Sequence, residues 1–425
     1  MDNCVIPQGY KATALGIIPQ EWEVKFLGNL LSRCANGLTY DVSITSGIPV
    51  TRIETISTGE INYAKVGYIP NESGYETFKM QKGDILYSHI NSLSQIGKVA
   101  YYKGDKEIYH GMNLLLLRAN EGLDKQYLYY TLLTDHMRHM AQVIAKPAVN
   151  QASISTSDLK RVKIAVPPLA EQRKIAEVLG VWDEAIEKQA RLIEKLDLRK
   201  RGLMQRLLSA KLRLPGFSEP WEKVKLGDIG HFLSSNTLSR DCLNEQIGNI
   251  KNIHYGDILI KLPTIVDASF IHIPYVNDDV IVKSDYLKNG DIIFADTAED
   301  YTVGKAIEII NIQAIPVTSG LHTIPFRPKS GIFVNRFLGY YVNSTDYRRQ
   351  LQPLIQGIKV YSISKTALCK TTLKIPTLSE QTAIAEVLTA ADREIELAKE
   401  KLERLRRQKR GLMQQLLTGK KRVKY

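Results

Sequence analysis

The chain has 425 residues, more than one hydrophobic core usually serves, so we expect two or more domains. Its formal net charge of +12 favours acidic partners, nucleic acid first. The four cysteines lack a CxxC spacing, which excludes a disulfide framework and a zinc knuckle. No apolar run approaches the ~18 residues that cross a bilayer, which excludes a membrane span. Together these observations indicate the cytoplasm.

Residues 11–168 form the first of two blocks of mixed sequence. Short β-rich runs (DILYS, KVAYY, NLLLLR and VKIAVP) are separated by Gly and Asn turns, and one short helix is expected near residues 125–140. This pattern predicts an α+β block.

A long helix is predicted to follow over residues 169–209. Its apolar residues recur at spacings of three and four, with Lys, Arg and Glu between them, which is the pattern of a coiled coil. Pro167 suits the approach to a helix start, and Pro215-Gly216 ends the helix. At ~1.5 Å per residue, some forty helical residues span about 60 Å, so the helix acts either as a ruler or as a stalk that joins domains.

The second half of the chain repeats this order. Residues 213–377 contain the runs DIIFA, KAIEII, HTIPFR and LKIP, with a short helix expected near residues 335–352, and a second long helix covers residues 378–418. Glu171 and Glu380 are 209 positions apart, as are Gly202 and Gly411, and roughly half of the paired helix positions are identical. The chain is therefore a duplicated half-molecule.

Each long helix offers one narrow apolar seam that needs a partner, and the nearest partner is the other copy. Two similar domains can meet a duplex equivalently when a pseudo-twofold axis relates them, and such an axis makes the attached helices antiparallel. We therefore predict that Ile175 lies near Leu412 and not near Ile384. The predicted seam residues are Ile175, Leu179, Trp182, Ile186, Ile193, Leu196, Leu203, Leu207, Ile384, Leu388, Ile395, Leu402, Leu405, Leu412 and Leu416.

Motifs for catalysis are missing from the sequence. No Gly-Lys dipeptide is followed by Ser or Thr, so there is no P-loop, and the Pro167-Pro168 pair lacks the neighbours of an amino-methyltransferase active site. The histidines have no third ligand at a metal-binding spacing. We expect neither a catalytic residue nor a metal site.

Nucleic-acid contact has better candidates. A polar, basic loop precedes each long helix, and a second polar segment follows the GDI strand of each half. Asn and Gln can bind adenine, Lys and Arg can bind guanine, and Ser and Tyr suit phosphates, although an ordinary solvated loop is the alternative. The candidate DNA-contact residues are Arg52, His89, Asn91, Lys98, Lys146, Asn150, Gln151, Ser153, Asn252, Thr297, Lys305, Arg348, Lys359, Tyr361 and Ser362.

These motifs resemble the specificity subunits of type I restriction-modification enzymes. The resemblance rests on the PPLAEQRKIAEVL and IPTLSEQTAIAEVL helix starts, the KRGLMQRLL and KRGLMQQLL helix ends, the WEVKFLG and WEKVKLG openings, and GLHTIPFRP. It covers nearly the whole chain. It implies an α+β fold with two target-recognition domains, joined by an antiparallel coiled coil, each reading one part of a split sequence in double-stranded DNA.

The resemblance also implies partners. Two modification subunits would supply S-adenosylmethionine binding and adenine methylation, and motor-nuclease restriction subunits would supply the use of ATP and Mg and DNA cleavage. The chain itself would bind no cofactor and catalyse nothing. The expected division is a first target-recognition domain (1–168), a spacer helix (169–212), a second target-recognition domain (213–377), a second spacer helix (378–419) and a basic tail (420–425).

Two other functions stay open on the residues alone. A self-contained DNA methyltransferase or nuclease would transfer methyl groups or cut DNA without partners. A coiled-coil adaptor without DNA binding would show an association with nucleic acid that hardly responds to salt. Differences between the halves, such as HGMNLLLLR against SGLHTIPFR, predict that the two recognition domains read different sequences.

Overall fold

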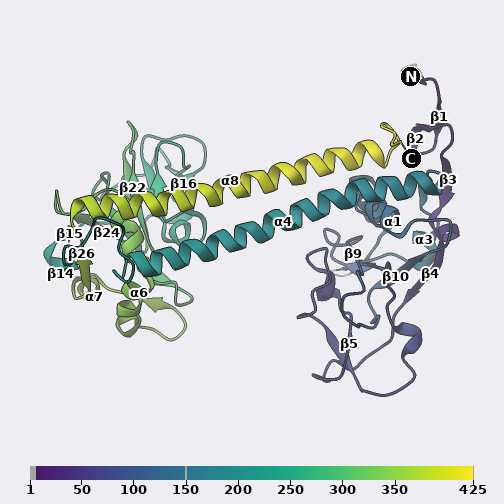
Figure 1. Cartoon of the computed structure of the whole chain (residues 1–425), viewed down its shortest axis with the longest axis horizontal. Helices are drawn as coiled ribbons and strands as arrows, with labels where there is room; N and C mark the ends of the chain where they lie inside the picture. Colours follow the sequence, from purple (N-terminus) through teal and green to yellow (C-terminus); the bar gives the residue numbers. More distant parts are fainter. Residues whose placement is uncertain (1–5, 149–150, 425) are drawn as a thin grey trace. The chain divides into compact units, whose positions relative to one another are not determined.

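A computed structural model describes residues 6–148 and 151–424. The described residues form two compact units: unit 1 lies within Met1–Gln189 and Lys401–Tyr425, and unit 2 is Ala190–Glu400. Each unit therefore holds one strand-rich block and a part of both long helices (Figure 1). These two units differ from the five segments expected from the sequence, which are two recognition domains, two spacer helices and a tail. That functional division stays a prediction.

Unit 1 is built on an antiparallel four-stranded sheet in the order β4-β10-β7-β9. The inner strand β10 carries an uninterrupted apolar run, and its residues Leu115, Leu116 and Leu117 are all fully buried because both faces of the sheet are covered. The strands are β1 (Tyr10–Thr13), β2 (Gly16–Pro19), β3 (Glu23–Phe26), β4 (Leu31–Asn36), β5 (Ile48–Val50), β6 (Gly67–Ile69), β7 (Ile85–Tyr87), β8 (Ile90–Asn91), β9 (Val99–Tyr101), β10 (Leu115–Ala119), β11 (Lys146–Ala148), β12 (Gln151–Ser153) and β13 (Lys163–Val166). The helices are α1 (Lys125–Leu132), α2 (Asp135–Ile144), α3 (Thr156–Lys160) and the first part of α4 (Leu169–Leu207).

Unit 2 has a five-stranded sheet in the order β15-β24-β20-β22-β18, in which only the β18–β22 pair is parallel. A second sheet has the order β16-β19-β17-β23. The strands are β14 (Glu222–Lys225), β15 (Gly230–Phe232), β16 (Leu243–Asn244), β17 (Lys251–Ile253), β18 (Ile265–Asp267), β19 (Tyr275–Val276), β20 (Ile292–Ala295), β21 (Thr297–Ala298), β22 (Ala306–Ile310), β23 (Val317–Ser319), β24 (Thr323–Pro328), β25 (Tyr361–Ser362) and β26 (Thr372–Ile375). The helices are α5 (Phe337–Val342), α6 (Thr345–Leu351), α7 (Lys365–Cys369) and the first part of α8 (Leu378–Leu416).

The predicted α+β class is confirmed, with two corrections to the short helices of each block. All eight apolar runs predicted as strands overlap a strand. In place of the one short helix expected near residues 125–140 and near residues 335–352 there are two, α1 with α2 and α5 with α6, and a third short helix in each block, α3 or α7, was not predicted. The break comes from Thr134 and Ser344, whose hydroxyl groups accept hydrogen bonds from Met137 N and Tyr347 N and so start a new helix.

Both long helices span 39 residues and end at equivalent positions, Leu207 and Leu416. They end before the predicted limits of 212 and 419, and α4 ends well before Pro215. Three residues beyond each end, Ala210 and Gly419 adopt the left-handed backbone conformation, with φ of 59° and 69°. A left-handed residue closes a helix without any need for proline.

In unit 1 the two long helices run antiparallel. Ile175 shares a buried cluster with Leu412 and Leu416, while Glu171 pairs with Arg422 and Asp183 pairs with Lys409. As the residue number rises along α4, the partner's number falls. The predicted proximity of Ile175 to Leu412 is therefore confirmed.

Unit 2 repeats this arrangement with the roles of the helices exchanged. Ile384 lies in one buried cluster with Leu207, and Leu203 packs against that cluster. Leu196 packs against Ile395 and Ala398. Along the predicted seam, nine residues are buried and the remaining six (Trp182, Ile186, Ile193, Leu203, Leu405 and Leu412) are half-buried.

Candidate nucleic-acid interface

In unit 1 the two predicted polar segments form a single small sheet. The loop before α4 is a hairpin of β11 and β12, in which Lys146 lies opposite Ser153. Strand β12 also pairs with β8, with Ala152 opposite Asn91. Residues about sixty positions apart in the sequence therefore share one surface.

Unit 2 brings its two polar segments together in the same way. Strand β21 pairs with β25, with Thr297 opposite Ser362. Residues 356–362 form a hairpin closed by two backbone hydrogen bonds between Gln356 and Ser362, of 3.0 and 2.8 Å. We call this segment the unit 2 hairpin, and the paired strands β11 and β12 the unit 1 hairpin.

The two hairpins occupy equivalent places in the repeat. Ile154 N donates to the carbonyl of His89, and Ile363 N donates to the carbonyl of Asp296. Ile154 and Ile363 are 209 positions apart, the same shift that relates the long helices. The duplication thus extends from the helices to the polar surface beside them.

The exposed candidates are concentrated on these hairpins. Lys146, Gln151 and Ser153 are exposed in unit 1, as are Lys359 and Ser362 in unit 2. Lys146 lies 3.5 Å from the carboxylate of Asp158, and three-quarters of its side chain is exposed. Asn150 lies outside the described residues.

Three predicted cations hold loops in place through backbone carbonyls. Lys98 Nζ donates to Ser57 O at 2.7 Å, and Lys305 Nζ donates to Leu259 O at 2.9 Å. Arg348 Nη2 donates to Tyr301 O at 2.6 Å. Burial lowers the pKa of both Lys305 and Arg348. All three cations are thus bound to backbone carbonyls of their own unit.

The other half-buried candidates have side-chain partners of their own. Arg52 Nε lies 3.5 Å from the Glu54 carboxylate, and Asn91 Nδ2 donates to Ser88 Oγ at 3.2 Å. Thr297 Oγ1 donates to Asp296 Oδ1 at 2.7 Å. The ring of Tyr361 stacks on that of Tyr301, with centroids 4.9 Å apart.

Two candidates lie in the interior, which corrects their predicted contact with DNA. Asn252 is 0 % exposed, and its Oδ1 accepts hydrogen bonds from Asn236 Nδ2 and Thr318 Oγ1 at 2.8 and 2.9 Å. His89 is 5 % exposed, and burial lowers its pKa to about 4, so its imidazole is neutral at pH 7. Both side chains are part of the packing of their unit.

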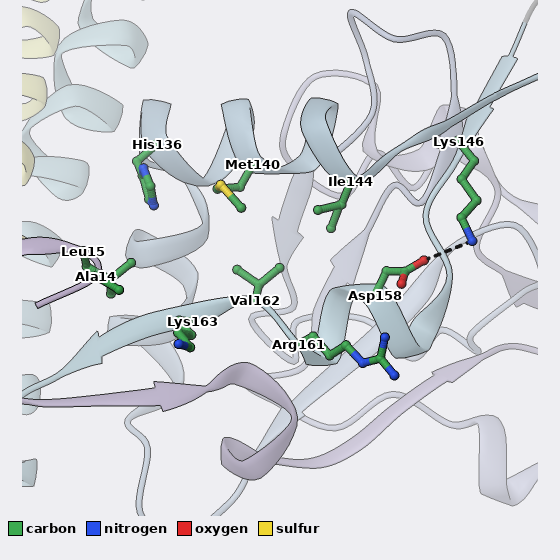
Figure 2. A pocket seen from close by; sticks show the side chains of 10 residues that line it. All are labelled: Ala14, Leu15, His136, Met140, Ile144, Lys146, Asp158, Arg161, Val162 and Lys163. Atoms are coloured by element: carbon green, nitrogen blue, oxygen red, sulfur yellow. Dashed lines mark ion pairs between the residues drawn. The ribbon is translucent and has the colours of Figure 1, made fainter.

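A pocket of about 520 Å³ lies beside the base of the unit 1 hairpin (Figure 2). Met140, Ile144 and Val162 give it an apolar lining. The basic side chains around it are His136, Lys146, Arg161 and Lys163, and the only carboxylate among the lining residues is that of Asp158. Such a surplus of basic groups favours an anionic group near the hairpin.

Buried ionic anchors, which the sequence did not predict as sites, join each strand-rich block to the start of a long helix. In unit 1 the carboxylate of Glu171 accepts hydrogen bonds from Trp22 Nε1 at 3.0 Å and from Arg422 Nε at 2.6 Å. In unit 2 Glu380 accepts from Trp221 Nε1 at 3.0 Å and from Arg213 Nε at 2.6 Å. A carboxylate in the first turn also interacts favourably with the helix dipole.

A second anchor lies farther along each helix. Tyr130 donates to Asp183 Oδ2 at 2.7 Å, and Lys409 pairs with the same carboxylate while its Nζ lies 4.9 Å from the centre of the Tyr130 ring. In unit 2, Tyr340 donates to Asp392 at 2.6 Å, and Lys200 pairs with Asp392 and lies over Tyr340. The signal in the sequence was the recurrence of these polar residues at matching places in both halves.

Within residues 6–148 and 151–424, no group of three or more His, Cys, Asp or Glu side chains is arranged to hold a metal ion. No helix in the same ranges is long and apolar enough to cross a membrane.

A family model and individual relatives match most of the length of the chain. The family model described as the type I restriction modification DNA specificity domain matches residues 19–197 and again residues 218–407. A Methanocaldococcus jannaschii protein assigned as the specificity subunit of the type I restriction enzyme MjaX is 32 % identical, over 98 % of this chain and 97 % of that protein. The MjaVIII specificity subunit of the same organism is 26 % identical over 96 % of this chain and 94 % of its own length.

Solved structures show the same fold. A chain from a structure of the type I R-M system, solved in a study of its assembly and conformational transition, matches with a TM-score of 0.59 and 17 % identity, over 95 % of this chain and 99 % of that one. The S subunit of a type I restriction-modification system from M. genitalium matches with a TM-score of 0.51 and 18 % identity, over 93 % and 96 % of the two chains.

Proposed function

The chain belongs to the family of type I restriction-modification DNA specificity subunits, and from this premise we propose that it reads a two-part sequence in double-stranded DNA, one part with each unit. One observation carries the proposal: each unit presents a polar hairpin beside a second polar segment, at equivalent places in the repeat. Two equivalent reading surfaces on one chain suit a target with two parts.

The chemistry of the hairpins suits both bases and phosphates. Gln151 offers an amide that can bind adenine bidentately, while Lys146 and Lys359 carry exposed cations. Ser153 and Ser362 supply hydroxyl groups of the kind that bind phosphates. Because the unit 1 hairpin carries Gln151 and the unit 2 hairpin carries Ile358 and Tyr361, the two half-sites differ in sequence.

The long helices set the distance between the half-sites and bind two modification subunits in this proposal. Those subunits supply S-adenosylmethionine and methylate adenine, and motor-nuclease restriction subunits supply ATP and Mg chemistry and DNA cleavage. The chain itself catalyses nothing. The support is its family, whose relatives are named specificity subunits.

Mapping methylated adenines in the source genome, with and without this gene, tests the proposal. We expect one two-part motif to lose its methylation when the gene is deleted and to regain it when the gene is restored. Binding of the purified complex to that motif should weaken steeply with salt, with a log–log slope of about 0.9 for each phosphate neutralised.

Three results would contradict the proposal. Deletion could leave every methylated motif unchanged. The purified chain alone could transfer methyl groups, which would make it a self-contained methyltransferase. Binding to nucleic acid could be insensitive to salt, which would make it a coiled-coil adaptor.

A further inference from the structure

The tip of the unit 2 hairpin presents an apolar side chain to solvent. Ile358 is 93 % exposed and Val360 is 53 % exposed. A single exposed apolar residue is ordinary on a protein surface. Here, however, the residue stands at the end of a tight hairpin on the surface proposed to meet DNA.

The hairpin holds this tip in a defined shape. Gly357 has a φ of 107°, and a Cβ atom at this position would lie 1.9 Å from the carbonyl oxygen of Val360. Only glycine allows so close an approach of the two backbone segments. The base of the hairpin is fixed by the pairing of Ser362 with Thr297 and by the two hydrogen bonds between Gln356 and Ser362.

An aromatic platform adjoins the hairpin. The Tyr301 ring is stacked on that of Tyr361 at an interplanar angle of 28°, and Tyr301 remains 66 % exposed. The loop of Tyr301 is held by Arg348 Nη2 and by the hydrogen bond of 2.8 Å from Thr302 N to Asp300 Oδ1. Exposed rings of this kind can stack on unpaired or partly unstacked bases.

From these contacts we propose that Ile358 inserts between two adjacent base pairs of the half-site read by unit 2. Proteins that kink DNA use apolar wedges of this type, which partly unstack one base step. Lys359, exposed beside the wedge, neutralises a phosphate of the kinked strand, and the tyrosine pair covers the opened base face. This inference rests on the proposed function and adds its mechanism in unit 2.

The test uses the complete complex with its modification subunits and duplexes carrying the mapped motif, with 2-aminopurine placed at each position of the unit 2 half-site in turn. The fluorescence of 2-aminopurine rises several-fold where stacking is lost. Besides the adenine that a modification subunit takes out of the stack for methylation, we expect one further step to brighten on binding. Ile358→Ala should remove this signal and weaken binding roughly ten-fold, the equivalent of about 1.4 kcal/mol.

Two control variants accompany this test. Ile358→Leu keeps an apolar wedge and should keep the signal. Ile281→Ala removes another exposed isoleucine of unit 2, which is 78 % exposed in a separate loop, and should bind as the unchanged chain does. Because Ile358 is almost fully exposed, its replacement by alanine leaves folding intact.

The possible contrary results separate the two proposals. Suppose that the unchanged complex binds its motif with the expected salt dependence. If no position other than the methylated adenine brightens, or if Ile358→Ala behaves as the unchanged chain, insertion is wrong while the proposed function stands. If Ile358→Ala keeps its signal but loses association with a modification subunit, the tip binds protein instead. If the unchanged complex does not bind the motif, the proposed function fails, and the insertion fails with it.

Discussion

A buried histidine in unit 1, His110, makes the stability of the protein depend on pH. His110 is 0 % exposed, and its Nε2–H donates to the carbonyl of Leu114 at 3.0 Å, which leaves Nδ1 unprotonated. Nδ1 has no hydrogen-bond partner among the residues that the structure describes. Burial lowers the pKa of His110 to about 4 from an ordinary value of 6.5.

This pKa shift predicts a loss of stability in mild acid. Between pH 6.5 and 4 the unfolded chain binds a proton at His110 that the folded chain does not, so the free energy of unfolding falls as the pH falls. The contribution is roughly 2 kcal/mol between pH 6.5 and 5, since each pH unit in this window is worth about 1.4 kcal/mol. Urea unfolding at pH 7 and pH 5 measures it.

The variant His110→Gln isolates this effect. It removes the titrating group, so its stability should fall less between pH 7 and pH 5 than that of the unchanged chain. His139→Gln, at an exposed position of α2, should retain the full dependence. An identical pH dependence in His110→Gln and the unchanged chain would show that His110 is not the group responsible.

Individual residues were harder to predict than their segments. The polar segment after the GDI strand was predicted from composition, but the burial of His89 was not, because a histidine at a strand end looks the same in sequence whether it faces solvent or the core. Asn252 is similar, since its partners Asn236 and Thr318 lie 16 and 66 positions away. The ion pair of Glu171 with Arg422 depends on residues 251 positions apart. Local patterns carry no information on such pairs.

The long helices could be predicted because their apolar residues recur at a regular spacing. Their seams follow a three-four spacing throughout, and the residues at those positions are buried or half-buried. The pairing of β12 with β8 was not predicted, because strand partners are set by tertiary packing and not by local sequence. The predicted polar segments were thus found, but their union into one surface came only from the fold.

The helix pair should be sensitive to charge at its centre. Leu196 is 6 % exposed and packs against Ile395 and Ala398 within unit 2. Leu196→Asp should lower the free energy of unfolding by roughly 3 kcal/mol or more, because it removes apolar burial and places a carboxylate there. Chemical denaturation followed by circular dichroism measures the change, and recognition of the DNA motif should be lost with it.

Leu198→Asp is the matched control for the helix pair. Leu198 lies two residues away on the same helix and is 60 % exposed, so the same change there should cost well under 1 kcal/mol. Equal stability of the two variants, or unchanged DNA specificity in Leu196→Asp, would argue against a packed seam that supports recognition.

At the scale of the whole molecule, duplication explains why each unit draws on distant parts of the chain. Unit 1 is completed by residues 401–424, which supply Leu416 to its core and Arg422 to its anchor. Unit 2 holds the equivalent Leu207 and Arg213. The antiparallel pairing of the helices was predicted from their two long, in-register copies, but the contribution of Arg422 to the anchor of unit 1 was not.

In the function that we propose, the paired helices set the gap between two half-sites. The variant carries seven inserted residues that continue the seam in each long helix, between Gln189 and Ala190 in α4 and between Glu400 and Lys401 in α8. Each insertion lengthens its helix by about 10 Å, the length of about three base pairs. The same insertion in the exposed loop at Asp278 and Asp279 is the control.

Mapping of methylated adenines in cells that carry each variant gives the most direct answer. We predict that the helix insertions keep both half-site sequences and widen the gap between them by about three base pairs, while the loop insertion leaves the gap as it was. An unchanged gap with the longer helices, in a complex that still methylates its motif, would show that the helices do not set the distance between the half-sites.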